Sequence, residues 1–162
     1  MASIDPVRTA DPEALALTKR LLSEARFATL ATLDDKAHPF ASLVSFALDR
    51  ATRPILLVSR LSGHTKHLLA DPRCSLLVGE PGKGDPLAHP RITIQCRAEA
   101  IPKEADESVV LKTLFLARHP KAALYADFPD FLFFRLQMFD ASLNGGFGKA
   151  FHLTEADLAF RP

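Results

Sequence analysis

"RFATLATLDDKAHPFASLVSFALD", residues 26–49, contains two apolar runs separated by a short polar segment. The first run is rich in β-branched and aliphatic residues, and "DDKAHP" has the composition of a turn. Large and small residues alternate in the second run, as they do where one face of a strand lies inside a barrel. The inward face of that strand is expected to carry Phe40, Ser42, Val44, Phe46 and Leu48. The stretch therefore predicts two β-strands joined by a turn.

Similar strand patterns recur along the chain with few helices between them. Further strands are expected at "ILLVS" (55–59), "RCSLLVGE" (73–80), "RITIQCRAEAI" (91–101) and, around a glycine corner, in 131–153. Helices are expected from Asp11-Pro12-Glu13, in 63–71 and in 104–118, with short helical turns in 119–130 and 154–160. This order favours a mainly β fold, an antiparallel sheet or closed barrel with peripheral helices, over a doubly wound parallel sheet.

Composition bounds the class of protein. The chain has 162 residues, enough for one domain, and 20 basic residues nearly balance 19 acidic ones. No basic run with aromatics suggests nucleic-acid binding, and no stretch is apolar enough for a signal peptide or a membrane span. Cys74 and Cys96 lie in apolar runs and are expected to be buried free thiols. A cytoplasmic protein is the expectation.

Polar residues gather in "SRLSGHTKHLLADPR", residues 59–73, where a strand ends and a helix begins. The first amides of a helix and its dipole favour an anion such as phosphate, and hydroxyls and a lysine add donors. The candidate phosphate ligands are Ser59, Ser62, His64, Thr65 and Lys66. The alternative is that Ser62 caps the helix and the other side chains are solvated.

Two other features carry open alternatives. The glycines of "NGGFGKA" (144–150) would let the backbone approach a flat ligand, or would form a turn between strands. His64 and His67 share a helical face, but no third ligand stands at a matching spacing, so no metal is assigned. The chain has no G-x-G-x-x-G fingerprint and no P-loop, and no catalytic triad or Cys–His pair can be argued from spacing.

In order along the chain, "RFATLATLDDKAHPFASLVSFALD", "ILLVSRLSGHTKHLLADPRCSLLV", "DPLAHPRITIQCRAEAI" and "NGGFGKAFHL" resemble the FMN-binding split-barrel family of pyridoxamine 5'-phosphate oxidase. The resemblance spans about residues 20–155 and is greatest to the haem-utilisation branch. It implies one FMN-binding split β-barrel domain of antiparallel Greek-key type over 1–162. Within it, 1–26 would hold an N-terminal helix, 27–155 the barrel and 156–162 a tail.

The resemblance also implies a cofactor site at a homodimer interface. The second strand would line the flavin and ribityl chain, with Val58 and Ser59 beside it and Thr65-Lys66 gripping the phosphate. Arg91 falls where a polar residue contacts the isoalloxazine ring, and Phe147 and Lys149 would approach it, from either subunit. The full set of expected cofactor ligands is Ser42, Leu43, Val44, Ser45, Val58, Ser59, Ser62, His64, Thr65, Lys66, Arg91, Phe147 and Lys149.

Departures from the family pattern leave the reaction open. Ser42 stands where pyridoxamine phosphate oxidases place a phosphate-binding arginine, and the chain ends "LTEADLAFRP" without their substrate-binding Arg/His run. Haem-degrading relatives usually carry a further C-terminal domain that contacts haem, and this sequence shows no counterpart. The expectation is an FMN-dependent oxidoreductase of unknown substrate with no assigned catalytic residue. The alternatives are a haem protein using one of six histidines as axial ligand, a non-catalytic flavin-binding module, or a protein that binds a relative such as coenzyme F420.

Overall fold

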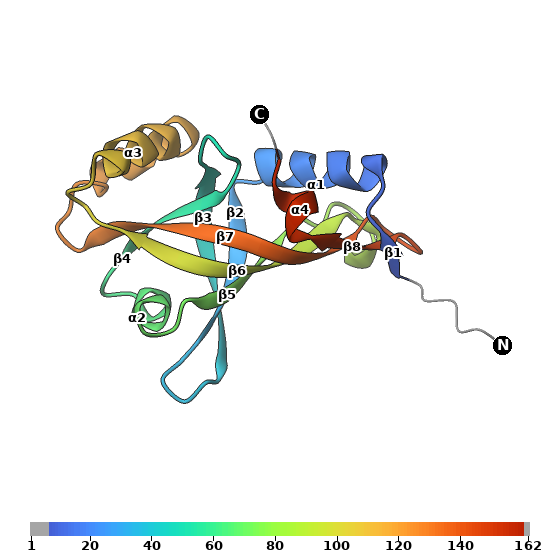
Figure 1. The fold of residues 1–162 in the computed structure, drawn as a ribbon, viewed down its shortest axis with the longest axis horizontal. Helices are drawn as coiled ribbons and strands as arrows, with labels where there is room; N and C mark the ends of the chain where they lie inside the picture. Colours follow the sequence, from blue (N-terminus) through green and yellow to red (C-terminus); the bar gives the residue numbers. More distant parts are fainter. Residues whose placement is uncertain (1–6, 161–162) are drawn as a thin grey trace.

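Six antiparallel strands close into a barrel in the computed structural model, which describes residues 7–160 (Figure 1). They follow one another around it as β2-β3-β4-β7-β6-β5, and β8 and β1 extend the sheet beyond β7. The strands are β1 Val7–Thr9, β2 Phe27–Leu33, β3 Pro39–Leu48, β4 Pro54–Ser59, β5 Arg73–Val78, β6 Arg91–Ile101, β7 Phe131–Asn144 and β8 Ala150–Thr154. The predicted mainly β barrel is confirmed.

The hairpin of β2 and β3 forms where the sequence predicts it. The Asp34 carboxylate accepts the amides of Lys36 and His38, which fixes the turn between the strands. Val44 and Phe46 are buried in the barrel, as expected from the alternation. Phe40 is a correction: it remains 44% exposed, because this end of β3 projects past the barrel.

The helices lie around the barrel. They are α1 Pro12–Glu24, α2 Gly63–Ala70, α3 Asp106–Arg118 and α4 Glu155–Leu158, with 3₁₀ turns η1 Pro86–Ala88 and η2 Pro120–Leu124. Asp11 caps α1 as predicted, its carboxylate accepting the Ala14 amide at 2.8 Å. The helix predicted from residue 104 begins instead at Asp106, after its N-cap Ala105. No helix within residues 7–160 is long and apolar enough to span a membrane.

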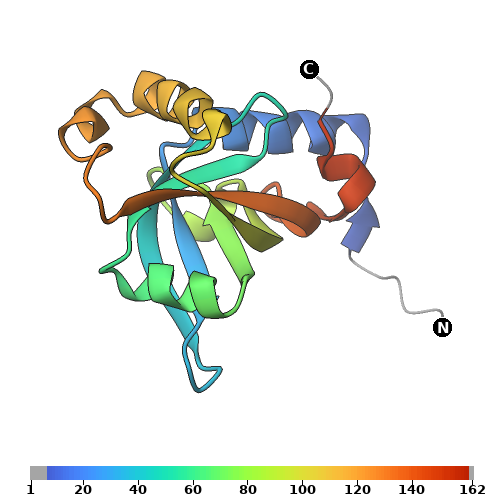
Figure 2. The ribbon, with the colours of Figure 1, turned by 60° about the vertical axis from the view of Figure 1, so that its left-hand side comes forward.

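The barrel is incomplete along one seam. β3 pairs with β4 only where Phe46–Leu48 face Pro54–Leu56, so the first half of β3 has no strand partner on that side. α2 follows β4 directly and lies near the free part of β3 (Figure 2). This gap between β3 and β4, next to the start of α2, is called the split below.

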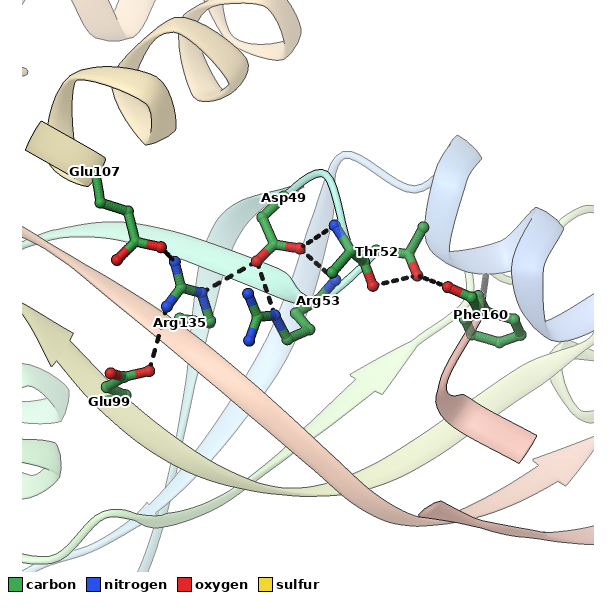
Figure 3. A network of polar contacts seen from close by, with 8 residues as sticks. Asp49, Thr52, Arg53, Glu99, Glu107, Arg135 and Phe160 are labelled. Atoms are coloured by element: carbon green, nitrogen blue, oxygen red, sulfur yellow. Dashed lines mark hydrogen bonds and ion pairs between the residues drawn. The ribbon is translucent and has the colours of Figure 1, made fainter. Parts of the chain in front are cut away.

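A buried ion cluster joins α3 to the barrel (Figure 3). Arg135 on β7, only 6% exposed, donates from Nε to Asp49 Oδ2 at 3.0 Å. Its other nitrogens contact Glu99 on β6 and Glu107 on α3. A second apolar core lies beneath α3, where Phe115 packs on Phe133 of β7. Together these contacts hold α3 against the outside of the barrel.

Candidate functional site

The start of α2 has free hydrogen-bond donors. Ser62 occupies the N-cap position, but its side chain makes no capping hydrogen bond, so the capping alternative is wrong in its simple form. The first amides of any helix lack partners within that helix. In the part of the chain that the structure describes, the amides of Gly63, His64 and Thr65 have no other acceptor. They form a local site of positive potential that suits an anion.

Ser59 prepares this site from the end of β4. Its hydroxyl donates to Asp130 Oδ2 at 2.5 Å and accepts the Leu61 amide at 3.1 Å, while its carbonyl accepts the Ser62 amide. These bonds fix the turn that leads into α2. Asp130 was not among the expected site residues, because its partner lies 71 positions away in the sequence. Ser59 therefore fixes the shape of the turn, and its hydroxyl hydrogen is already donated to Asp130 and not free for a ligand.

Two histidines fasten α2 to the hairpin. Ser42 Oγ lies 3.1 Å from His64 Nδ1, and Thr32 Oγ1 lies 2.9 Å from His67 Nδ1. The His67 ring also packs edge-on against Phe40, with centroids 5.0 Å apart. Burial, and then the proximity of His67, lower the pKa of His64 below its ordinary value of 6.5. His64 is therefore neutral at pH 7 and offers a hydrogen bond rather than a charge.

Thr65 and Lys66 separate into different roles. Thr65 is fully buried, and its Oγ1 has no hydrogen-bond partner in the described structure. Its side chain packs inward with Leu68, so only its amide can face a ligand outside the protein. Lys66 is exposed, and no described residue forms an ion pair with it. Lys66 is the cation that the start of α2 can offer to a phosphate.

The free edge of β3 supplies the second part of the site. The Phe46 amide donates to the Arg26 carbonyl oxygen, on the β2 side of β3. Because the backbone groups of successive residues in a strand point to opposite sides, those of Leu43 and Ser45 point toward β4. β4 does not pair with β3 at these residues, which leaves their N–H and C=O groups available in the split. Leu43 is 69% exposed on the outer face, whereas Val44 and Val58 are buried in the barrel. Unpaired backbone beside an exposed apolar side chain suits a flat ring with polar edges.

The remaining expected ligands lie elsewhere in the same chain. Ser59 pairs with Phe131 at the start of β7, whereas Arg91 pairs with Asn144 at its end. Figure 1 shows α2 and the turn before β8 on opposite sides of the molecule. Arg91 Nη1 donates to two loop carbonyls, at 3.0 and 3.3 Å. The structure therefore does not bring Arg91, Phe147 or Lys149 to α2 within one chain.

The turn before β8 is itself well defined. Gly146 and Gly148 have positive φ, and a Cβ on Gly146 would stand 3.0 Å from the Ala88 carbonyl oxygen. The turn interpretation of "NGGFGKA" is thus confirmed, since it joins β7 to β8. Phe147 at its tip is 72% exposed, and the side chain of Lys149 is 58% exposed, with its Nζ 4.0 Å from Glu13 Oε1. Both side chains are therefore accessible from outside.

The chain is similar in sequence to known proteins. The sequence profile of the pyridoxamine 5'-phosphate oxidase family matches residues 16–143. The chain is 38% identical over 110 residues to the chloroplastic non-canonical heme oxygenase HOZ of Arabidopsis thaliana, covering 67% of this chain and 33% of that protein. This chain thus spans about a third of that relative's length.

Solved structures show the same fold. A heme binding protein from Mycobacterium smegmatis superposes with a TM-score of 0.84 at 30% identity, over 93% of this chain and 62% of that one. The heme storage protein HutZ of Vibrio cholerae superposes with a TM-score of 0.69 at 22% identity, over 80% of this chain and 90% of that one. At this identity the similarity shows the fold alone. With the closed barrel and the profile match over most of its length, the chain belongs to the pyridoxamine 5'-phosphate oxidase family.

Proposed function

We propose that the chain binds FMN in the split, with the phosphate at the start of α2 and the ring system along the free edge of β3. The observation that carries the proposal is the adjacency of two unsatisfied donor sets, held together by the contact between Ser42 and His64. One set consists of the first amides of α2, and the other of the backbone groups of Leu43 and Ser45. A ligand with a phosphate at one end and a flat polar-edged ring at the other matches both.

The residues present fit such a cofactor chemically. Lys66 supplies the charge that a phosphate ester needs, and the neutral His64 can share a hydrogen bond without competing for it. FMN, when bound, supplies hydride transfer at its N5 atom. The chain's own residues bind and orient the cofactor, and the exposed Leu43 shields one part of the site from water. The proposed activity is an oxidoreductase reaction, with no acid or base assigned in the protein.

A homodimer completes this proposal. Arg91 pairs with the last residue of β7, and Phe147 and Lys149 follow in the turn between β7 and β8, whereas the split lies near the start of β7. A second copy would therefore have to supply these three residues. Apolar side chains on the outer face of the barrel offer a surface for that copy: Phe27, Leu43, Leu77 and Phe139, each more than 40% exposed. There Arg91 or Lys149 would stabilise negative charge on a reduced ring.

Replacement of Lys66 tests the phosphate assignment. Lys66→Ala removes a charge-assisted contact and is expected to weaken FMN binding about tenfold or more. Lys121→Ala, which removes an exposed lysine from η2, is the matched control and should bind FMN like the wild type. Isothermal titration with FMN measures both. Equal FMN affinities of the two variants would show that Lys66 does not bind the phosphate.

Haem is the second candidate ligand, and the relatives favour it. The HOZ protein is named as a heme oxygenase and the Mycobacterium smegmatis protein as a heme binding protein, at 38% and 30% identity. A histidine would have to serve as the axial ligand, and each of the six has one ring nitrogen already in a polar contact. Haem titration tests this function: a Soret band that saturates at one haem per chain supports it, and its absence excludes it.

A further inference from the structure

A cavity lies far from the split, between α1 and the turn that precedes β8. It has a volume of about 440 Å³, within the range of small-molecule sites. Figure 1 shows α1 passing over the part of the sheet that β8 and β1 form. The lining residues are Arg8, Asp11, Glu13, Ala14, Ala16, Leu17, Arg20, Pro90, Gly145, Lys149 and Phe151.

The wall of this cavity is apolar. Ala14 is 2% exposed and Phe151 is 7% exposed, so both belong to the packed core behind it. Leu17 lies against the glycine turn, where a Cβ on Gly145 would stand 3.5 Å from Leu17 Cδ2. Pro90 adds a further apolar surface. The body of a ligand in this cavity would therefore be apolar.

Charged groups line the same cavity in an uneven balance. Arg8, Arg20 and Lys149 provide three cations against the carboxylates of Asp11 and Glu13, an excess of one positive charge. The Asp11 carboxylate is already used to cap α1. Lys149 Nζ lies 4.0 Å from Glu13 Oε1, and the two side chains are 58% and 87% exposed, so these two charges offset each other and solvent screens both. The cavity thus favours an anion, and its balance matches a single negative charge better than a double one.

Two of the cations differ in how they are held. Arg8 Nη2 donates to the Gly148 carbonyl at 3.2 Å, and its guanidinium lies 5.8 Å from the centre of the Phe151 ring. These contacts orient Arg8 and leave further N–H donors free. The guanidinium of Arg20 has no partner among residues 7–160. An oriented arginine and an unpaired one beside an apolar wall are suited to bind a carboxylate.

We propose that this cavity binds a small monocarboxylate with a flat apolar body, at a site separate from the split. The carboxylate lies between Arg8 and Arg20, and the apolar body rests against Leu17 and Phe151. The site stands whether or not the split holds FMN, since it shares no residue with α2 or β3. Lys149 lines this cavity and is also proposed to reach the cofactor of a second copy, so in a dimer the two sites would share that residue.

Titration with 2-naphthoate tests the proposal, with 2-naphthalenemethanol as the uncharged analogue of the same shape. The wild-type chain is expected to bind the acid in the submillimolar range and the alcohol about tenfold or more weaker, because the alcohol lacks the charge. Equal binding of the two compounds, or no binding of the acid at millimolar concentration, would overturn the proposal.

Variants locate the bound acid. Arg20→Gln and the cavity-filling Ala16→Phe are each expected to weaken naphthoate binding about tenfold, while Arg50→Gln, an exposed arginine of the β3–β4 turn, has no effect. Lys66→Ala is expected to bind naphthoate like the wild type, which separates this site from the split. Loss of naphthoate binding in Lys66→Ala but not in Arg20→Gln would place the acid at α2 and refute the inference.

Discussion

The Ser42 hydroxyl lies 3.1 Å from Nδ1 of His64, so the first turn of α2 is fixed to the unpaired edge of β3. This contact joins segments 22 residues apart, and it aligns the helix start with the split. Because β4 leaves β3 before this point, β3 is held here by β2 on one side and has no strand neighbour on the other. The proposed cofactor site therefore depends on contacts between α2 and the β2–β3 hairpin, and the Ser42–His64 contact is the one in the first turn of the helix.

The first prediction concerns the charge of His64. Its folded-state pKa is lowered by burial, so the unfolded chain takes up a proton more readily than the folded one. The stability from the neutral ring is fully present above the unfolded value of about 6.5 and is lost as the pH falls through the lower folded value. The urea midpoint of the wild type should therefore drop between about pH 7.5 and about pH 5.

His64→Gln should show a smaller drop over the same pH interval, since it has no ring to protonate. His38→Gln is the control, because His38 is 73% exposed in a surface turn, and it should follow the wild type. If the urea midpoints of the wild type and His64→Gln fall in parallel with pH, then burial does not lower the pKa of His64.

The second prediction concerns assembly. Leu77 on β5 and Leu43 on β3 are both paired with Thr29 of β2, so they share the outer face of the sheet. Leu77→Glu places a charge on that face without disturbing the barrel interior, since Leu77 is 42% exposed. We expect the wild type to be a dimer by light scattering and this variant to be a monomer with weakened FMN binding. Leu124→Glu, on η2 away from this face, should remain dimeric.

The third prediction concerns the buried ion cluster. The side chain of Asp49 is 5% exposed and accepts hydrogen bonds from Arg135, Arg53 and the Ala51 amide. Asp49→Ala removes the most buried of the three carboxylates that contact Arg135 and leaves the amides of Ala51 and Arg53 without their acceptor, at a cost of about 1–3 kcal/mol in unfolding free energy. Asp127→Ala removes an exposed ion pair with Lys112 and should change stability little. Similar urea unfolding curves for the two variants would contradict this assignment.

The fourth prediction concerns the two thiols. Cys74 and Cys96 face each other across β5 and β6 in the barrel, and burial raises the pKa of Cys74 to about 12 and raises that of Cys96 as well. Neither forms the reactive thiolate at neutral pH. Ellman's reagent at about pH 8 should label no thiol in the folded chain and both in urea. Rapid labelling of the folded chain would show that the barrel opens there.

Local patterns predicted most of the fold. The strands were predictable because alternation and turn residues act over a few positions, as at Asp34 and Phe46. β1 was missed because its three exposed residues gain their strand form only by pairing in parallel with β8. The start of helix α3 was placed two residues early, because Ala105 rather than a polar residue occupies its N-cap.

The candidate site was predictable only in part. The polar cluster at α2 predicted an anion site; the structure leaves the first amides of α2 without an acceptor and Lys66 exposed, but it buries the side chain of Thr65. The bond of Ser59 to Asp130 could not be foreseen, since it joins residues far apart in the sequence. The burial of Thr65, in contrast, was predictable from the sequence, because Thr65 and Leu68 are three residues apart on one face of the helix. The position of Arg91 at the far end of β7 depends on the register of the closed barrel, which no local pattern encodes.

Titration of the flavin-free wild-type chain with FMN, followed by flavin absorbance and fluorescence, decides whether the split is a flavin site. We expect a yellow complex with one FMN per chain and a dissociation constant in the micromolar range or below. A chain that stays colourless, and leaves FMN fluorescence unchanged at micromolar concentrations, would contradict the assignment of the split as a flavin site.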